Sequence, residues 1–171
     1  MTHSEKLAAI RGLMKDQGVD AYIIPSSDPH ISEYLPERYK CIAWTSGFTG
    51  SAGTLVITQD FAGLWTDARY FVQANEQLAS SGFELVKLKV QGASEYAEWL
   101  GEQLSKGAKV AFDGNLASLL LAQSVQTILS PLGIVVDGHV DLLSPLWEGR
   151  PSLPLAAAYL LEESTTGQST F

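Results

Sequence analysis

Two neighbouring segments decide the fold of this sequence: Trp44-Thr-Ser-Gly-Phe-Thr-Gly-Ser-Ala-Gly-Thr54 and Leu64-Trp-Thr-Asp-Ala-Arg-Tyr-Phe71. In the first, glycines recur at every third position. Glycine adopts positive φ angles without steric cost and lets neighbouring groups approach closely. The segment therefore predicts a tight connection between strands, in which Ser46, Thr49 and Ser51 cap local backbone groups.

A glycine-rich loop can also bind phosphate through its backbone N–H groups. The spacing Gly47-x-x-Gly50-x-x-Gly53 matches neither the dinucleotide-binding fingerprint nor a Walker A loop, and no Gly-Lys-Ser/Thr follows it. The strand connection is therefore the preferred interpretation.

The sequence on either side of this loop is typical of strands. Gly53–Thr58 and Ala62–Thr66 are joined by Gln59-Asp60 with Gly63 nearby, which predicts an antiparallel hairpin. Cys41–Thr45 also has the composition of a β-rich segment. Upstream, Thr2-x-x-Glu5 can form a capping box for a helix that ends at Gly18, and Ala21–Ile24 predicts a buried strand.

The second half alternates helices and strands. Helices are predicted over 68–78, after the N-cap Ser94 to 106, and over 117–132; strands are predicted over 83–90, 109–113 and 133–137. Such alternation requires crossover connections. The fold class is therefore α/β, with a mixed β-sheet flanked by helices.

Composition limits the domain count and the partners. With 171 residues, 46% hydrophobic and 18% charged, the chain can form one domain with a sizeable core. Its formal charge of −8 disfavours nucleic acid as a partner. Cys41 is the only cysteine, so no intramolecular disulfide can form, and a cytoplasmic location is expected.

No signal peptide is visible, and no apolar run approaches the ~20 residues that span a bilayer. Membrane partners are therefore not expected. Prolines at 145, 151 and 154 interrupt the pattern near the end of the chain. We place a domain at 1–150 and a linker toward a missing second domain at 151–171.

Three segments, 25–34, 44–54 and 64–74, closely resemble the amino-terminal domain of Xaa-Pro aminopeptidase (aminopeptidase P), in its three-domain branch. Leu146–Pro154 resembles the sequence motif at the end of that domain. The resemblance implies a creatinase/prolidase N-terminal fold with ribonuclease H-like architecture. It also implies that the chain is a non-catalytic domain, excised or truncated, of a metallopeptidase hydrolase.

In that family, two divalent metals, usually manganese, are held by two Asp, one His and two Glu of a carboxy-terminal domain. The resemblance implies that none of these ligands lies in this chain. It further implies that the partners are the middle and catalytic domains of the same polypeptide, a peptide substrate with a penultimate proline, and a second subunit in a homodimer. The domain would help to form the entrance of the active-site cleft and subunit contacts.

The candidates for residues that reach this cleft are Asp28, His30, Tyr34 and Arg69. Asp28-Pro-His30 with Glu33 also places three potential metal ligands close together, but Pro29 and the lack of an i, i+4 pair argue against a preformed site. Two interpretations remain: a surface loop that turns toward the catalytic domain, or a structural Asx-type turn.

Arg69 likewise has two interpretations. Asp67 can cap the helix that follows it while Arg69 pairs with a carboxylate. Alternatively, the resemblance implies that Arg69 projects toward the substrate or the partner domain. No catalytic or metal-binding residue is assigned to the chain itself.

Two other functions compete with this one. The chain can be a stand-alone assembly or binding module, or a metal-dependent nuclease that uses Asp60, Asp67, Asp113 and Asp137 near strand ends. The net charge and the lack of a basic stripe weigh against the nuclease. The four tryptophans are expected to pack in the core or at the domain boundary, and Cys41 is expected to be a buried small hydrophobe.

Overall fold

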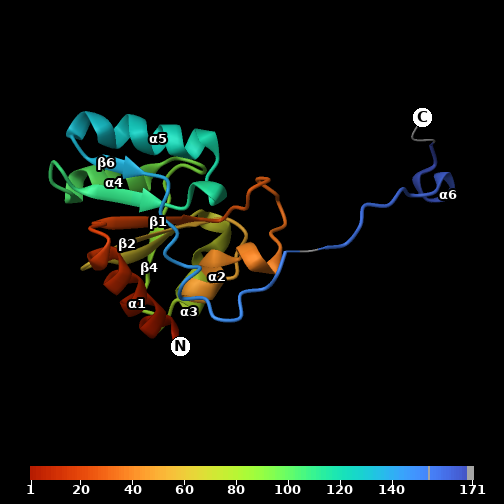
Figure 1. The fold of residues 1–171 in the computed structure, drawn as a ribbon, viewed down its shortest axis with the longest axis horizontal. Coiled ribbons are helices and arrows are strands. Elements are labelled where there is room, and N and C mark those ends of the chain that lie inside the picture. The colour runs from red at the N-terminus through yellow and green to blue at the C-terminus, as the bar shows by residue number, and fades with distance from the viewer. Residues whose placement is uncertain (154, 169–171) are drawn as a thin grey trace.

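A six-stranded mixed sheet lies between two layers of helices (Figure 1). The computed structural model describes residues 1–153 and 155–168. The strand order is β4-β3-β2-β1-β5-β6. The strands are β1 (Ala21–Pro25), β2 (Thr54–Thr58), β3 (Ala62–Thr66), β4 (Glu84–Lys87), β5 (Lys109–Phe112) and β6 (Val135–Asp137). The predicted α/β class with a mixed sheet is confirmed.

Helices cover both faces of the sheet (Figure 1). One face carries α1 (His3–Asp16), α2 (Cys41–Ser46) and α3 (Phe71–Gln77), and the other carries α4 (Glu95–Gln103) and α5 (Leu119–Leu129). Short 3₁₀ turns occupy 37–39, 68–70, 114–116 and 130–132, and α6 (Glu163–Thr166) follows near the end. The capping box predicted at Thr2 and Glu5 is present at the start of α1.

Strand β2 runs antiparallel to both of its neighbours, whereas every other pair in the sheet is parallel. The predicted β2–β3 hairpin is confirmed. Consequently the ends of β1, β3, β4, β5 and β6 and the start of β2 lie at one edge. We call this the carboxyl edge; its loops are 26–35, 47–53, 67–70, 88–94 and 113–118.

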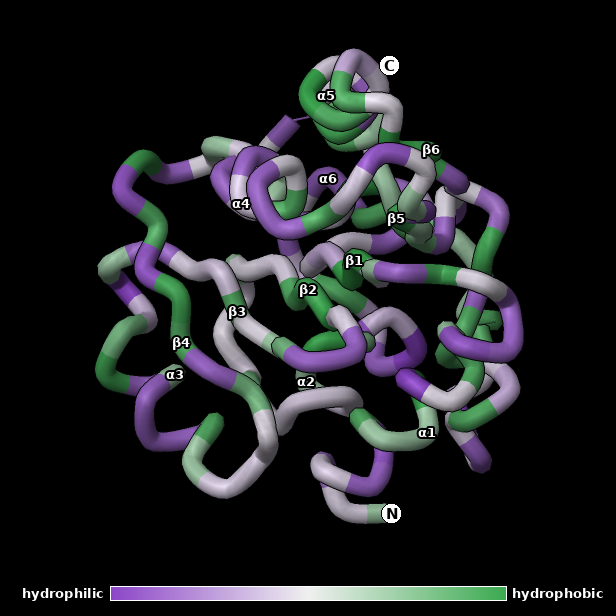
Figure 2. Tube along the Cα trace, turned by 90° about the vertical axis from the view of Figure 1, so that its left-hand side faces the viewer, coloured by the Kyte–Doolittle hydropathy of each residue, from purple (hydrophilic) through white to green (hydrophobic). Residues whose placement is uncertain are grey.

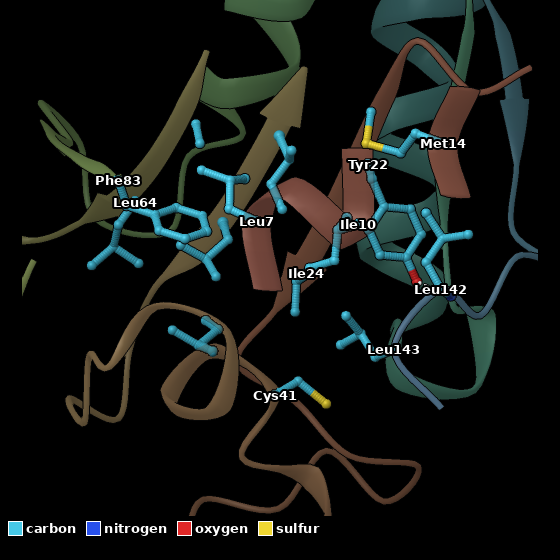
Figure 3. Close-up of a cluster of buried hydrophobic side chains, with 14 of the residues drawn as sticks. Leu7, Ile10, Met14, Tyr22, Ile24, Cys41, Leu64, Phe83, Leu142 and Leu143 are labelled. Atoms are coloured by element: carbon cyan, nitrogen blue, oxygen red, sulfur yellow. Dashed lines mark hydrogen bonds between the residues drawn. The ribbon is translucent and has the colours of Figure 1, made fainter. Parts of the chain in front are cut away.

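Strand β1 is buried on both faces, as its continuous apolar run predicts. Figure 2 shows hydrophobic residues gathered along the central strands. On one face, Tyr22 and Ile24 pack with Ile10 and Met14 of α1 (Figure 3). On the other face, Ile23 packs in a second cluster with residues of α4 and α5.

The four tryptophans pack as predicted, in two places. Trp65 and Trp99 lie 5.3 Å apart between ring centroids, beside Phe61 in the second cluster. Trp44 and Trp147 stack at 4.9 Å with an interplanar angle of 15°.

The stacked pair Trp44–Trp147 connects segment 143–150 with the helices α1 and α2 near the start of the chain. Lys6 lies 4.6 Å from the Trp44 ring centroid, and Arg150 lies 5.1 Å from that of Trp147. The Arg150 side chain also donates to the carbonyl of Arg38 at 3.0 Å. Alternating cations and rings therefore tie segment 143–150 to α1 and α2.

The predicted strand-like segment at Cys41–Thr45 is wrong, because these residues form helix α2. The buried positions are 41, 42, 45 and 46, which share one face of a helix rather than one face of a strand. The glycine segment consequently joins a helix to a strand, and not two strands as predicted.

Other elements differ in extent from their predictions. The helix predicted over 68–78 begins as a 3₁₀ turn and becomes α-helical at Phe71. The helix predicted over 117–132 ends at Leu129 and continues as a 3₁₀ turn, in which Pro131 has no N–H to donate. The predicted strands over 83–90 and 133–137 are also shorter in the structure.

The hydroxyl of Tyr22 is a buried link between β1 and the chain after β6. It donates to the carbonyl of Val140 at 3.0 Å and accepts from the amide of Leu142 at 3.3 Å. Burial raises the pKa of this phenol, so it stays protonated.

We expect Tyr22→Phe to lower the free energy of unfolding by about 1–3 kcal/mol, because it leaves a buried carbonyl and a buried amide without a partner. Urea denaturation measures this, with Tyr159→Phe as the control on an exposed tyrosine. Equal stability of the two variants would contradict the structural role of the hydroxyl.

Candidate functional site

The glycine segment 47–53 lies at the carboxyl edge and separates two hollows. The first, with a volume of about 650 Å³, is here called the aromatic groove; its lining includes Tyr34, Leu35, Tyr39, Trp44, Phe48 and Trp147. The second, of about 640 Å³, is here called the polar hollow; it includes Thr54, Thr66, Asp67, Arg69, Ser94 and Ser118. Residues 48–51 line the first hollow and residues 52–54 line the second, so we call segment 47–53 the ridge between them.

Packing explains the glycines of this ridge. Gly47 ends helix α2 with φ of 85°, and a Cβ there would lie 2.9 Å from the His3 ring. A Cβ on Gly50 would lie 2.2 Å from the Phe48 ring. The Ser46 hydroxyl accepts from the amide of Phe48, as the predicted local capping requires. These contacts give a packing reason for glycine at positions 47 and 50.

Asp28 anchors the loop that follows β1. Its side chain is only 1% exposed, and Oδ1 accepts from the amides of His30 at 2.9 Å and Ser32 at 3.0 Å. This is the Asx-type turn considered from the sequence. Burial opposes ionisation, but the hydrogen bonds from Ser32 and His30 outweigh it and lower the pKa of Asp28 below its ordinary value.

The tip of the same loop is displayed to solvent. Tyr34 is 85% exposed and Ile31 is 57% exposed, and His30 is exposed as well. Ile31 has φ of 55°, which is an uncommon conformation for a β-branched residue. The buried Asp28 turn therefore holds a strained backbone that presents large apolar side chains.

Arg69 is held by a bidentate ion pair with Asp67. Nε and Nη2 of Arg69 donate to the two carboxylate oxygens at 2.9 and 2.8 Å, and the Arg69 amide donates to Oδ1 at 3.1 Å. Asp67 thus caps the turn as predicted. The hydrogen bonds from the Arg69 side chain hold the pKa of Asp67 below its usual range.

Arg69 is nevertheless accessible, since its side chain is 59% exposed. Its guanidinium lies 5.3 Å from the centroid of the Tyr70 ring, and the Tyr70 hydroxyl is 2.7 Å from that of Ser51 on the ridge. The ion pair and the ring fix the orientation of the cation at the carboxyl edge.

The four candidate residues share the carboxyl edge but do not form one cluster. Tyr34 lines the aromatic groove and Arg69 lines the polar hollow, on opposite sides of the ridge. Asp28 is buried below its loop, and His30 lines neither hollow. Sequence reasoning missed the aromatic groove, because Trp147 contacts Trp44 from more than a hundred residues away in the sequence.

Cys41 is buried in the first core cluster, as predicted. Burial raises the pKa of its thiol to about 11, although Arg150 lies 3.6 Å from the sulfur. The thiol therefore stays protonated near neutral pH and packs as a small apolar group.

Within residues 1–153 and 155–168, no three His, Cys, Asp or Glu side chains are grouped so that they can hold a metal ion. Of the aspartates considered for a nuclease, Asp60 lies in the β2–β3 turn, at the opposite end of the sheet from Asp67, Asp113 and Asp137. The four aspartates therefore do not form the acidic cluster that a metal-dependent nuclease needs. None of the helices described is long and apolar enough to cross a membrane.

The structure is thus an α/β domain with one antiparallel strand and a glycine ridge at its carboxyl edge. Residues 6–139 match the model of the creatinase/prolidase N-terminal domain. The chain belongs to this family.

The most similar relatives include Xaa-Pro aminopeptidases. Aminopeptidase P2 of Arabidopsis thaliana is 43% identical over 155 residues, which cover 88% of this chain and 22% of the relative. Xaa-Pro aminopeptidase 2 of Homo sapiens is 36% identical over 95% of this chain and 24% of the relative. The chain thus spans about a quarter of the relatives it matches.

Among solved structures, X-prolyl aminopeptidase from Caenorhabditis elegans aligns with a TM-score of 0.87 and 32% identity. The alignment covers 99% of this chain and 29% of that one, which is described as a cytosolic enzyme with a di-nuclear active site. The N-terminal domain of the peptidase PepQ from Mycobacterium tuberculosis, at 23% identity and a TM-score of 0.63, shares the fold.

Substitution of Asp28 by Asn tests the charge of the anchor. A carboxylate whose pKa is lowered on folding contributes stability above the unfolded pKa of ~3.9, and this contribution disappears as the pH falls through the folded pKa. We therefore expect the wild-type chain to be more stable than Asp28→Asn at pH 7, with a smaller difference at pH 3. Urea denaturation of both proteins at pH 7 and pH 3 measures this. If the wild type and Asp28→Asn differed in unfolding free energy by the same amount at both pH values, the charge of Asp28 would not contribute to stability.

Proposed function

We propose that this chain is the non-catalytic N-terminal domain of a metal-dependent Xaa-Pro aminopeptidase, which removes an N-terminal residue that precedes proline. The observation that supports it best is the agreement with the C. elegans enzyme over 99% of this chain but 29% of that one. This chain therefore corresponds to one part of a longer enzyme. Because that enzyme is described as cytosolic, we propose a cytosolic location for the complete protein. A homodimer is proposed from the family resemblance alone.

The chemistry is proposed to lie in the remainder of the polypeptide. The C. elegans enzyme is described as having a di-nuclear active site, and the described residues of this chain hold no ligand group for even one metal. We assign two divalent metals, with manganese as the candidate, to the catalytic domain. Such a pair would supply Lewis acidity and an activated water.

This domain would help to build the entrance of the active-site cleft and contacts between subunits. The carboxyl edge suits that role, because it displays Tyr34 and Arg69 on either side of the ridge and His30 at a loop tip. Asp28 would position the loop rather than touch the substrate. We further propose that residues 1–150 form the domain and that residues 151–171 link it to the next one.

A stand-alone assembly module is the second candidate. Leu155, Tyr159 and Leu160 are more than 70% exposed, so the end of the chain offers apolar contacts. Size-exclusion chromatography with light scattering shows whether the purified chain associates by itself. A monomer would argue against the assembly module, whereas a stable oligomer agrees with either candidate, since the aminopeptidase domain is also proposed to make subunit contacts.

The purified chain is expected to release no N-terminal residue from an Xaa-Pro peptide in the presence of Mn²⁺. Chromatography of the released amino acid measures this, with an established Xaa-Pro aminopeptidase as the positive control. Manganese-dependent release by the chain itself would overturn the proposal that it is non-catalytic.

In the complete polypeptide, we expect Arg69→Ala to lower kcat/KM for a proline-containing peptide about tenfold or more, since a cation held at the cleft wall would be lost. Val72→Ala is the control, because Val72 is exposed and lies in helix α3 outside both hollows. If Arg69→Ala left kcat/KM unchanged, the proposal that Arg69 contributes to the active-site cleft would be wrong.

A further inference from the structure

We propose that segment 155–161 is a cleavage site for an endopeptidase that accepts a tyrosine or leucine side chain before the bond it cuts. The reaction is hydrolysis: one water molecule adds across the peptide bond between Tyr159 and Leu160, which leaves a carboxylate on Tyr159 and an amine on Leu160. Cleavage there separates the folded domain from the residues that follow. This inference uses no part of the aminopeptidase reaction, so its failure leaves the proposed function unchanged.

The backbone of this segment is open to a protease. Residues 155–161 belong to no helix or strand, and every one of them is exposed. None of their amides or carbonyls makes a hydrogen bond within the part of the chain that the structure describes. Figure 1 shows this stretch running away from the domain toward α6. Proteolytic cleavage concentrates in exposed backbone of this kind, because nothing has to be broken before the protease binds.

The side chains of the segment suit an apolar specificity pocket. Leu155 is 92% exposed, Tyr159 is 82% exposed and Leu160 is 75% exposed. Chymotrypsin-like endopeptidases bind the side chain before the cut bond in a hydrophobic slot. An aromatic ring buries the most apolar area in such a slot. Tyr159 is therefore the residue that we expect before the main cut, and the three alanines that precede it add little bulk beside it.

The contacts that close the domain end before this segment. Trp147 stacks on Trp44, and Nη1 of Arg38 donates to the carbonyl of Pro151 at 2.9 Å. Residues 155–161 belong to neither core cluster, and among the described residues they take part in no ion pair. A cut within them therefore removes none of the contacts that hold the domain, and the larger product is expected to stay folded.

Exposure of the side chain alone does not select the site. Tyr34 is 85% exposed and Tyr159 is 82% exposed, so the two tyrosines are equally accessible. The backbone around the first is held on both sides, by the Asp28 turn and by a hydrogen bond of 2.8 Å from the Tyr39 amide to the Pro36 carbonyl. Cleavage after Tyr34 therefore requires local opening of the loop, whereas cleavage after Tyr159 does not.

Limited digestion of the purified, folded chain with chymotrypsin tests the proposal, and intact mass spectrometry identifies the products. We expect the bond after Tyr159 to be cut about tenfold or more faster than the bond after Tyr34, because only the second requires opening. The product 1–159 is expected to resist further digestion and to keep the thermal unfolding midpoint of the uncut chain. Tyr159→Ser is expected to slow the loss of uncut chain about threefold or more, and Tyr34→Ser, its matched control, is expected to leave the rate unchanged.

Three results would overturn the proposal. The first is a cut after Tyr34, or at another bond within 1–150, that is as fast as the cut after Tyr159. The second is an equal rate of digestion for the wild type and Tyr159→Ser. The third is a lower unfolding midpoint of the product 1–159, which would make the segment part of the folded domain. Circular dichroism of both variants shows whether the substitutions leave the chain folded, so that their rates can be compared.

Discussion

The antiparallel pairing of β2 with β1 is the constraint on which the rest of the structure depends. Strand β1 is buried on both faces, and Ile23 lies opposite Val56 of β2. A one-residue shift of this register would turn Tyr22 and Ile24 toward the second cluster and Ile23 toward the first, so both clusters would have to repack. The reversed direction of β2 then brings Gly53 to the edge at which β1, β3 and β5 end. The ridge lies at the carboxyl edge for this reason.

The second interaction that determines the structure is the stacking of Trp44 on Trp147. It joins α2, which directly precedes the ridge, to segment 143–150. The same contact forms one wall of the aromatic groove. The attachment of segment 143–150 and the shape of the aromatic groove therefore both depend on one pair of rings.

Much of the fold was predictable from sequence, because its signals are local. The continuous apolar run at β1, the hairpin turn at Gln59-Asp60 and the alternation of helix and strand each depend on nearby residues. Helix α2 was not predicted, since Cys41–Thr45 has strand-like composition and only its burial pattern identifies the helical face. The composition of so short a segment does not distinguish the two-residue repeat of a strand from the 3.6-residue repeat of a helix.

The site was predictable only in part. The Asp28 turn and the Asp67 cap follow from side-chain chemistry within four residues, and both are present. The aromatic groove was not predictable, because it combines residues 34–51 with Trp147 through tertiary packing. The roles of His30, Tyr34 and Arg69 at a cleft, and the boundary near Pro151, stay predictions, since they concern parts of the polypeptide beyond this domain.

The central claim is that the carboxyl edge of this domain faces the catalytic remainder of an aminopeptidase. Hydrogen–deuterium exchange, compared between the complete polypeptide and this chain alone, tests the claim most directly. Our account predicts that the amides of 28–34, 47–53 and 67–70 exchange more slowly in the complete polypeptide, while those of the opposite edge, at 17–20 and 59–61, are unchanged. Protection at the opposite edge, with none at the carboxyl edge, would contradict it.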